Sequence, residues 1–168
     1  AAYCQDKGRE SLHWLLAPRD GQPGRWQQLG EGPLYRMGLQ PRWVGQGDTL
    51  YVEHPGGKAG ESVLAPFDFA KSAPGDTLIS APGFDFEGSL LGDREGRQLL
   101  GVRVVSDGEQ TIWFDAAHKA AQQRADAALP GQINRVQCRR CGSVDEVMLV
   151  RSFSDRDPGR LFLWRQAD

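Results

Sequence analysis

Residues 92–115, GDREGRQLLGVRVVSDGEQTIWFD, carry the clearest structural signal in the chain. Three runs rich in β-forming residues lie in this stretch or directly before it: 89–91, 99–105 and 111–114. The segments that separate them, Asp-Arg-Glu-Gly at 93–96 and Ser-Asp-Gly at 106–108, have the composition of turns. The stretch therefore predicts a meander of three neighbouring antiparallel strands.

Similar runs occur on both sides of this meander, so a series of antiparallel sheets is expected. Further strands are predicted at 11–16, 25–29, 42–44, 49–53, 61–70, 76–80, 132–137, 147–153 and 160–164. The first two of these are interpreted as the last strands of a sheet whose beginning is absent, and a turn at 17–21 follows the first.

One segment breaks the β pattern. Residues 116–129, AAHKAAQQRADAAL, are rich in Ala and contain no β-branched residue, which favours a helix. Asp115 is positioned to be its N-cap, and Pro130-Gly131 is a typical stop signal. We expect one short helix inserted in a β framework.

The composition narrows the class of protein. The chain has 168 residues, of which 39% are hydrophobic and 25% charged, so it can form an ordinary globular core. Its 21 Gly and 10 Pro are dispersed, as in a fold of many short strands. A net charge of −2 without a basic run argues against nucleic-acid binding, and no apolar run is long enough to span a membrane. The start of the chain has no Met and no signal-peptide pattern, so we interpret the chain as a mature product or a piece of a longer protein.

The three cysteines suggest little chemistry. Cys138 and Cys141 have a C-x2-C spacing, which can form half of a zinc site, but the other half is missing. Only Cys4 and three scattered histidines remain as ligands: His13, His54 and His118. We interpret the pair as ordinary strand or turn thiols, with a metal site and a disulfide as alternatives, and expect no tightly bound metal.

Three hairpins repeat one pattern, in which a strand is followed by a turn containing Asp or Gly and by a strand that ends in an aromatic residue. They are residues 48–68, 96–115 and 147–164. Four-stranded units that recur every 40 to 50 residues or so are typical of a β-propeller. The whole of 1–168 is therefore predicted to be all-β, a partial β-propeller of about three four-stranded antiparallel blades with one helix. Its approximate blades are 10–30 (partial), 34–81, 84–131 and 132–168 (partial), and a β-sandwich is the alternative.

The segment LLGDREGRQLLGVRVVSDGEQTIWFDAAHKAAQQRADAALPGQINRV (90–136) resembles part of the propeller of prolyl oligopeptidase-family serine peptidases, in the bacterial acylaminoacyl-peptidase-like and dipeptidyl-peptidase-like branch. SFSDRDPGRLFLW (152–164) is similar to the next strand pair of that family. The resemblance is strong over 84–168 and weaker over 10–83. It implies a propeller of roughly seven or eight blades over an α/β-hydrolase domain, of which this chain holds about three.

The resemblance does not extend to catalytic residues. No G-x-S-x-G nucleophile elbow occurs, so no catalytic, cofactor-binding or metal-binding residue can be assigned. The expected role is non-catalytic: the segment supports the missing hydrolase domain and gates peptide access to it. Expected partners are that hydrolase domain, peptide substrate and a second copy of the segment, in either the cytoplasm or the periplasm. The alternative is a stand-alone β scaffold or a ligand- or peptide-binding module.

Other motifs have simpler structural interpretations. Residues 54–58, His-Pro-Gly-Gly-Lys, lack the spacing of a phosphate-binding P-loop and are interpreted as a hairpin loop. Two carboxylate pairs, Asp85 with Glu87 and Asp155 with Asp157, are interpreted as turn formers rather than as cation ligands or acid–base groups. Five tryptophans are expected to pack between blades, with a peptide-binding patch as the alternative: Trp14, Trp26, Trp43, Trp113 and Trp164.

Overall fold

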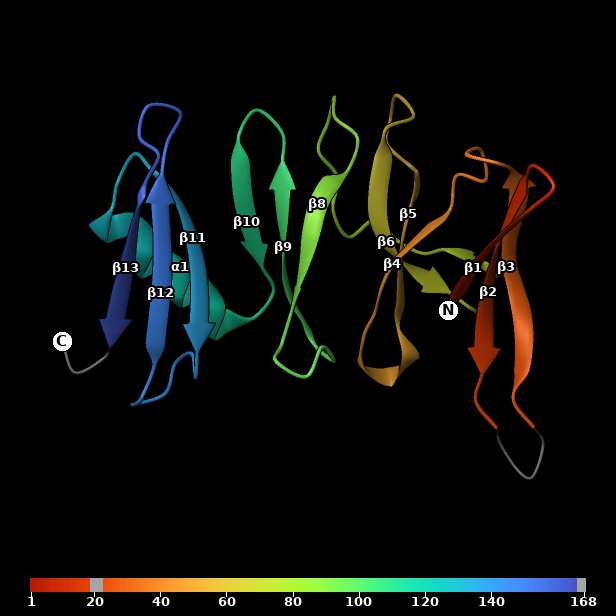
Figure 1. Cartoon of the computed structure of the whole chain (residues 1–168), viewed down its shortest axis with the longest axis horizontal. Coiled ribbons are helices and arrows are strands. Elements are labelled where there is room, and N and C mark those ends of the chain that lie inside the picture. Colours follow the sequence, from red (N-terminus) through yellow and green to blue (C-terminus); the bar gives the residue numbers. More distant parts are fainter. Residues whose placement is uncertain (19–22, 166–168) are drawn as a thin grey trace. The chain divides into compact units, whose positions relative to one another are not determined.

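The computed structural model describes residues 1–18 and 23–165, which form antiparallel sheets and one α-helix (Figure 1). The chain divides into two compact units, 1–87 and 88–168. No helix of the described part is long and apolar enough to cross a membrane. The turn predicted at 17–21 falls mostly outside the described residues.

The first unit contains two sheets. One has the order β1 (Ala2–Asp6), β2 (Arg9–Leu16) and β3 (Arg25–Pro33). The other has the order β4 (Gln40–Val44), β5 (Leu50–Pro55), β6 (Ser62–Asp68) and β7 (Ala73–Pro74). A 3-10 turn, Gln46–Asp48, joins β4 to β5.

The second unit contains two more sheets and the helix. The first of these sheets consists of β8 (Glu87–Gly92), β9 (Leu99–Val105) and β10 (Glu109–Trp113). Helix α1 (Ala116–Ala128) follows. The last sheet consists of β11 (Ile133–Arg139), β12 (Val147–Phe153) and β13 (Arg160–Arg165).

Every sheet is an antiparallel meander in which chain order equals spatial order. The predicted all-β class with a single helix is therefore confirmed, as are the three repeated hairpins, which correspond to β5–β6, β9–β10 and β12–β13. The expectation of four-stranded sheets holds for only one of the four, and no sheet of the described residues closes on itself.

Two strands differ from the sequence prediction. The first sheet has one strand before the two that were predicted, because β1 pairs with β2 through a turn at Lys7 and Gly8, whose φ angles are +47° and +76°. Two successive residues with positive φ are typical of a tight hairpin turn. The fourth strand of the second sheet is β7 and not 76–80, where Ile79 makes only an isolated bridge to Leu64.

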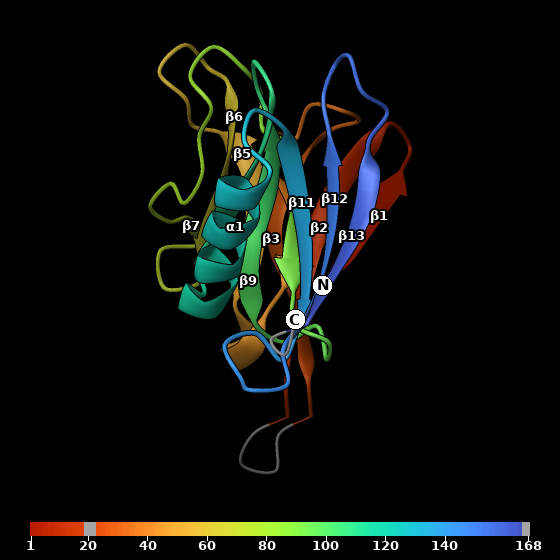
Figure 2. The ribbon, with the colours of Figure 1, turned by 90° about the vertical axis from the view of Figure 1, so that its left-hand side faces the viewer.

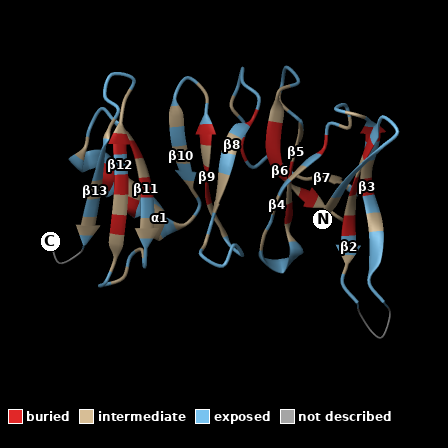
Figure 3. Ribbon diagram, in the orientation of Figure 1, coloured by how far each residue is buried: buried red, intermediate tan, exposed pale blue. Residues whose placement is uncertain are grey.

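The buried residues concentrate on the inner strands of the sheets, as Figure 3 shows for β2, β6, β9 and β12. In the first unit the two sheets share a core, made by Leu12, Trp14, Leu29, Leu39, Leu50, Val52 and Phe67. In the second unit Figure 2 shows α1 beside β11. Ala121 and Ala125 of α1 contact a cluster of Val136, Met148 and Val150 on β11 and β12. The small alanine side chains let the helix approach the sheet closely.

The predicted helix ends are confirmed. Asp115 is the N-cap, and its carboxylate accepts a hydrogen bond from the backbone N–H of His118 at 2.8 Å. The helix stops at Ala128, and Gly131 just beyond it has a φ of +72°.

Candidate functional site

Three arginines surround one glutamate in the second unit. Arg103 lies on β9, Arg135 on β11 and Arg151 on β12, and Glu109 lies at the start of β10. The Nε of Arg135 donates to Glu109 Oε1 at 2.6 Å, and its Nη2 donates to the other carboxylate oxygen. The Nε of Arg103 lies 3.4 Å from Glu109 Oε1. We call Arg103, Arg135 and Arg151 the arginine cluster.

The positive and negative charges of this cluster are unbalanced, because three guanidinium groups share one carboxylate among residues 1–18 and 23–165. The hydrogen bond from Arg135 is the main cause that lowers the pKa of Glu109, and the same bond raises the pKa of Arg135. Burial lowers the pKa of Arg103, against the opposing attraction of Glu109. The Nε atom of Arg103 is buried and has no hydrogen-bond partner within the described part of the chain. Part of the donor capacity of the arginine cluster is therefore unused.

Arg135 and Arg151 lie directly opposite each other in the β11–β12 register. Like charges at such cross-strand positions repel each other. The ring of Phe153 attracts both groups, since the guanidinium carbons lie 5.1 Å (Arg135) and 4.9 Å (Arg151) from its centroid. On the other side of Arg151 the register places Leu161 of β13, whose side chain is 67% exposed.

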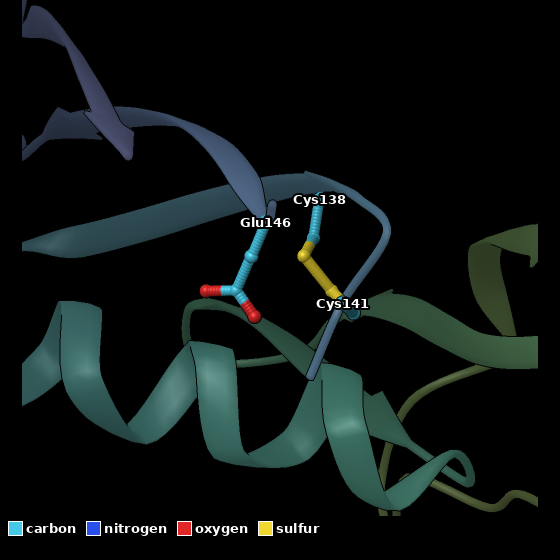
Figure 4. Close-up of side chains that lie close together, drawn as sticks. All are labelled: Cys138, Cys141 and Glu146. Carbon is cyan, nitrogen blue, oxygen red and sulfur yellow. A yellow bond between two sulfur atoms is a disulfide. The ribbon is translucent and has the colours of Figure 1, made fainter. Parts of the chain in front are cut away.

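A second cluster lies at the end of β11. Cys138 and Cys141 form a disulfide, with Cα atoms 5.6 Å apart, so the interpretation of this pair as ordinary thiols is wrong. Figure 4 shows the carboxylate of Glu146 beside the disulfide. Gly142 N–H donates to Glu146 Oε2 at 2.7 Å, and Arg124 of α1 forms an ion pair with the same carboxylate.

The disulfide determines what this second cluster can bind. Thiolates are the zinc ligands of such a pair, and both sulfurs are consumed in the S–S bond. The ligand atoms of Cys138, Cys141 and Glu146 lie within 4.8 Å of one another, so they offer three metal ligands only after reduction. An open cavity of about 470 Å³ adjoins the cluster, lined by Arg124, Gly142, Glu146, Met148, Trp164 and Arg165.

The structure also pairs a serine with a histidine on β2, which sequence reasoning missed. Ser11 Oγ lies 2.9 Å from Nε2 of His13. The two residues are two positions apart, so they share one face of the strand. The carboxylate opposite Ser11 in the β2–β3 register, Glu31, binds Arg9 and Gln28. This geometry contains a nucleophile and a base but does not arrange a carboxylate behind the base.

The loop after β5 keeps its interpretation as a hairpin loop. The backbone N–H groups of Gly56 and Gly57 donate to the backbone oxygen of Glu61. The Glu61 side chain accepts from Ala59 N–H and from Gly83 N–H, both at 3.0 Å. These backbone donors are thus used within the chain and do not form a cradle for phosphate.

In each of the two carboxylate pairs, one member accepts a hydrogen bond from a backbone N–H group. Asp85 Oδ1 accepts from Ser62 N–H at 2.7 Å, and Asp157 Oδ1 accepts from Gly159 N–H at 2.9 Å. Asp155 lies 3.8 Å from the guanidinium of Arg156. Only the Asp157 contact, with a residue two positions away, is that of a turn-forming carboxylate, whereas Asp85 joins two segments 23 positions apart.

The tryptophans do not share one role. Trp14 packs in the core between the two sheets of the first unit, and Trp164 packs on the helix side of the last sheet. Trp43 stacks on Tyr51, and Trp113 donates a hydrogen bond to Gln122. Trp26 is 56% exposed, so the expectation that all five tryptophans are packing residues is wrong for this one.

Sequence reasoning also missed the arginine cluster. The available signal was a charged residue in the interior of each of three predicted strands, at Arg103, Arg135 and Arg151. Comparison of the chain with protein-family models, curated proteins and solved structures found no match.

Proposed function

We propose that this chain is a non-catalytic part of the β-propeller of a prolyl-oligopeptidase-like serine peptidase. The observation that carries the proposal is the succession of four separate antiparallel meanders in which chain order equals strand order. Propeller blades are meanders of this kind. The resemblance of residues 84–168 to the propeller of that family points in the same direction.

In such an enzyme the propeller restricts access to the active site of the hydrolase domain. The segment described here would supply binding surface and size exclusion, while the nucleophile, base and oxyanion hole belong to the hydrolase domain. Peptides are then the substrate class, because folded proteins are too large to enter.

The coding sequence that contains this segment provides the first test. The proposal expects about 250 further residues downstream, with a G-x-S-x-G elbow followed by an Asp and a His. A reading frame without these features contradicts the proposal and supports a stand-alone binding module.

A labelling experiment tests whether the chain itself is inactive. The purified chain is incubated with a serine-directed fluorophosphonate and with chromogenic aminoacyl and prolyl peptides. We expect no labelling and no turnover above background, because no carboxylate of the described residues is hydrogen-bonded to His13, and Glu31 nearby is bound to Arg9 and Gln28 instead. Stoichiometric labelling that disappears in Ser11→Ala would overturn the non-catalytic assignment.

A further inference from the structure

We propose that the arginine cluster, together with Leu161, is a binding site for a carboxylate carried by a peptide. The site lies on the sheet face where Arg135, Arg151 and Leu161 form one cross-strand row over β11, β12 and β13. The choice of a peptide as the carrier rests on the proposed function. The site itself depends only on the charges and contacts of the second unit.

The charge balance favours an anion. Among the described residues Glu109 compensates one of the three guanidinium groups, so the cluster keeps an excess of two positive charges, with Arg103 and Arg135 partly buried and Arg151 exposed. Arg135 and Arg151 are held opposite each other despite their repulsion. A bound anion would bridge them and remove this repulsion.

The donor geometry favours a carboxylate. Arg135 uses its Nε and Nη2 for Glu109. Arg151 is exposed, and its guanidinium group lies over the ring of Phe153. The planar group therefore has a fixed orientation and remains accessible to a ligand. A guanidinium fork binds carboxylates through two parallel hydrogen bonds.

The apolar neighbours favour a ligand larger than an inorganic ion. Leu161 lies directly beside Arg151, and Leu163, 55% exposed, follows two residues later on the same face of β13. A peptide whose last side chain is apolar can cover these leucines while its carboxylate contacts Arg151. The site therefore selects for an acid group next to an apolar side chain.

The test measures binding of fluorescein-labelled tripeptides to the whole chain by fluorescence polarisation. The peptides are Ala-Ala-Leu with a free carboxylate, its C-terminal amide, and Ala-Glu-Leu amide. We expect the free acid to bind about tenfold or more tightly than the Ala-Ala-Leu amide, the usual effect of a hydrogen bond to a charged group. Tight binding of Ala-Glu-Leu amide would also support the site and would identify a side-chain carboxylate as the ligand.

Variants assign the effect to the site. Arg151→Gln should weaken binding of the free acid about tenfold, and Leu161→Ser should also weaken it, because the last leucine of the peptide loses its apolar neighbour. Both residues are exposed, so both variants should keep the fold, which circular dichroism and urea unfolding verify. Arg156→Gln, in an exposed turn, is the matched control and should bind as the parent chain does.

Equal binding of the free acid and both amides, or an unchanged affinity in Arg151→Gln, would overturn this inference. Because the assay involves no hydrolysis, that failure leaves the proposed peptidase relationship intact. Conversely, a reading frame without a hydrolase domain would contradict the proposed function but not the carboxylate-binding site.

Discussion

Glu10 is a buried carboxylate that organises the connection after β3. It accepts hydrogen bonds from the backbone N–H groups of Tyr35, at 3.0 Å, and Met37, at 2.7 Å, and from the hydroxyl of Tyr3. The hydrogen bond from Tyr3 and then that from Met37 lower the pKa of Glu10 from its ordinary value of 4.5. The same contact with Glu10 raises the pKa of Tyr3. One side chain thus connects β1, β2 and the segment that leads to β4.

The lowered pKa of Glu10 predicts a pH-dependent stability. A carboxyl whose pKa is lower in the folded state stabilises the fold above its unfolded pKa, and this contribution is lost as the pH falls through the folded pKa. Glu10→Gln should therefore lower the urea midpoint at pH 7, and the difference from the parent chain should shrink as the pH drops below 4.5. Urea unfolding between pH 3 and 7 or so measures this. Glu95→Gln in an exposed turn is the control, and a pH-independent difference would contradict the prediction.

The role of Glu10 could not be predicted from the sequence. A single Glu just before the expected strand 11–16 gives no sign that two amides 25 and 27 positions further on will donate to it. The arginine cluster was missed for the same reason, since its members are spread over three strands. The Asp115 cap, by contrast, was predictable because capping is local and involves a residue only three positions away.

At the scale of elements, α1 depends on that cap. Asp115 accepts from His118 N–H, and the pKa of Asp115 is lowered chiefly by the hydrogen bond from the His118 side chain. Asp115→Ala removes the acceptor, so we expect a loss of about 1 kcal/mol in the free energy of unfolding, measured by urea denaturation. Lys119→Ala, at an exposed position of the helix, is the control and should change the free energy of unfolding by less than about 0.5 kcal/mol. Equal effects of the two substitutions would show that the cap does not stabilise the helix.

The disulfide at the end of β11 closes a very short loop, with a sequence separation of 3. Loop-closure entropy for so short a loop amounts to about 2 kcal/mol, so reduction should destabilise the chain by about this amount or less and should not unfold it. A thiol-reactive chromophore such as Ellman's reagent should detect one thiol, exposed Cys4, before reduction and all three cysteines afterwards. Three reactive thiols in a chain purified under oxidising conditions would contradict the disulfide.

The strands that were predicted correctly have strong local signals, and those that were missed do not. β9 consists largely of Leu and Val, β10 alternates between half-buried and exposed residues, and Ser-Asp-Gly joins the two strands. β1 (Ala2–Asp6) has mostly exposed, polar residues, and only its pairing with β2 makes it a strand. β7 is only Ala73–Pro74, and the more β-like residues 76–80 that follow bond to β6 only at Leu64, through Leu78 and Ile79, so they form no regular strand.

At the scale of the whole chain, each sheet has two edge strands and several apolar side chains remain exposed. β13 is an edge in the described residues, and its outer face carries Leu161 and Leu163, whereas Phe162 and Trp164 on the other face pack towards the helix. Unpaired edges and exposed apolar residues favour association with another chain. We therefore predict that the chain self-associates through this edge.

Burying about 400 Å² of apolar surface at this face would contribute on the order of 10 kcal/mol before the entropic cost of association. Since that cost is of similar size, we expect weak association that becomes visible as the concentration rises into the micromolar range or above. Static light scattering over a concentration series should give a mass that increases from the 18.5 kDa of a single chain. Leu161→Lys combined with Leu163→Lys should hold the mass at that of the monomer, because the apolar area is lost and two more positive charges join those of Arg135 and Arg151 on each copy. A parent chain that stays at 18.5 kDa at every concentration, like the double variant, would show that this face does not bind a second copy.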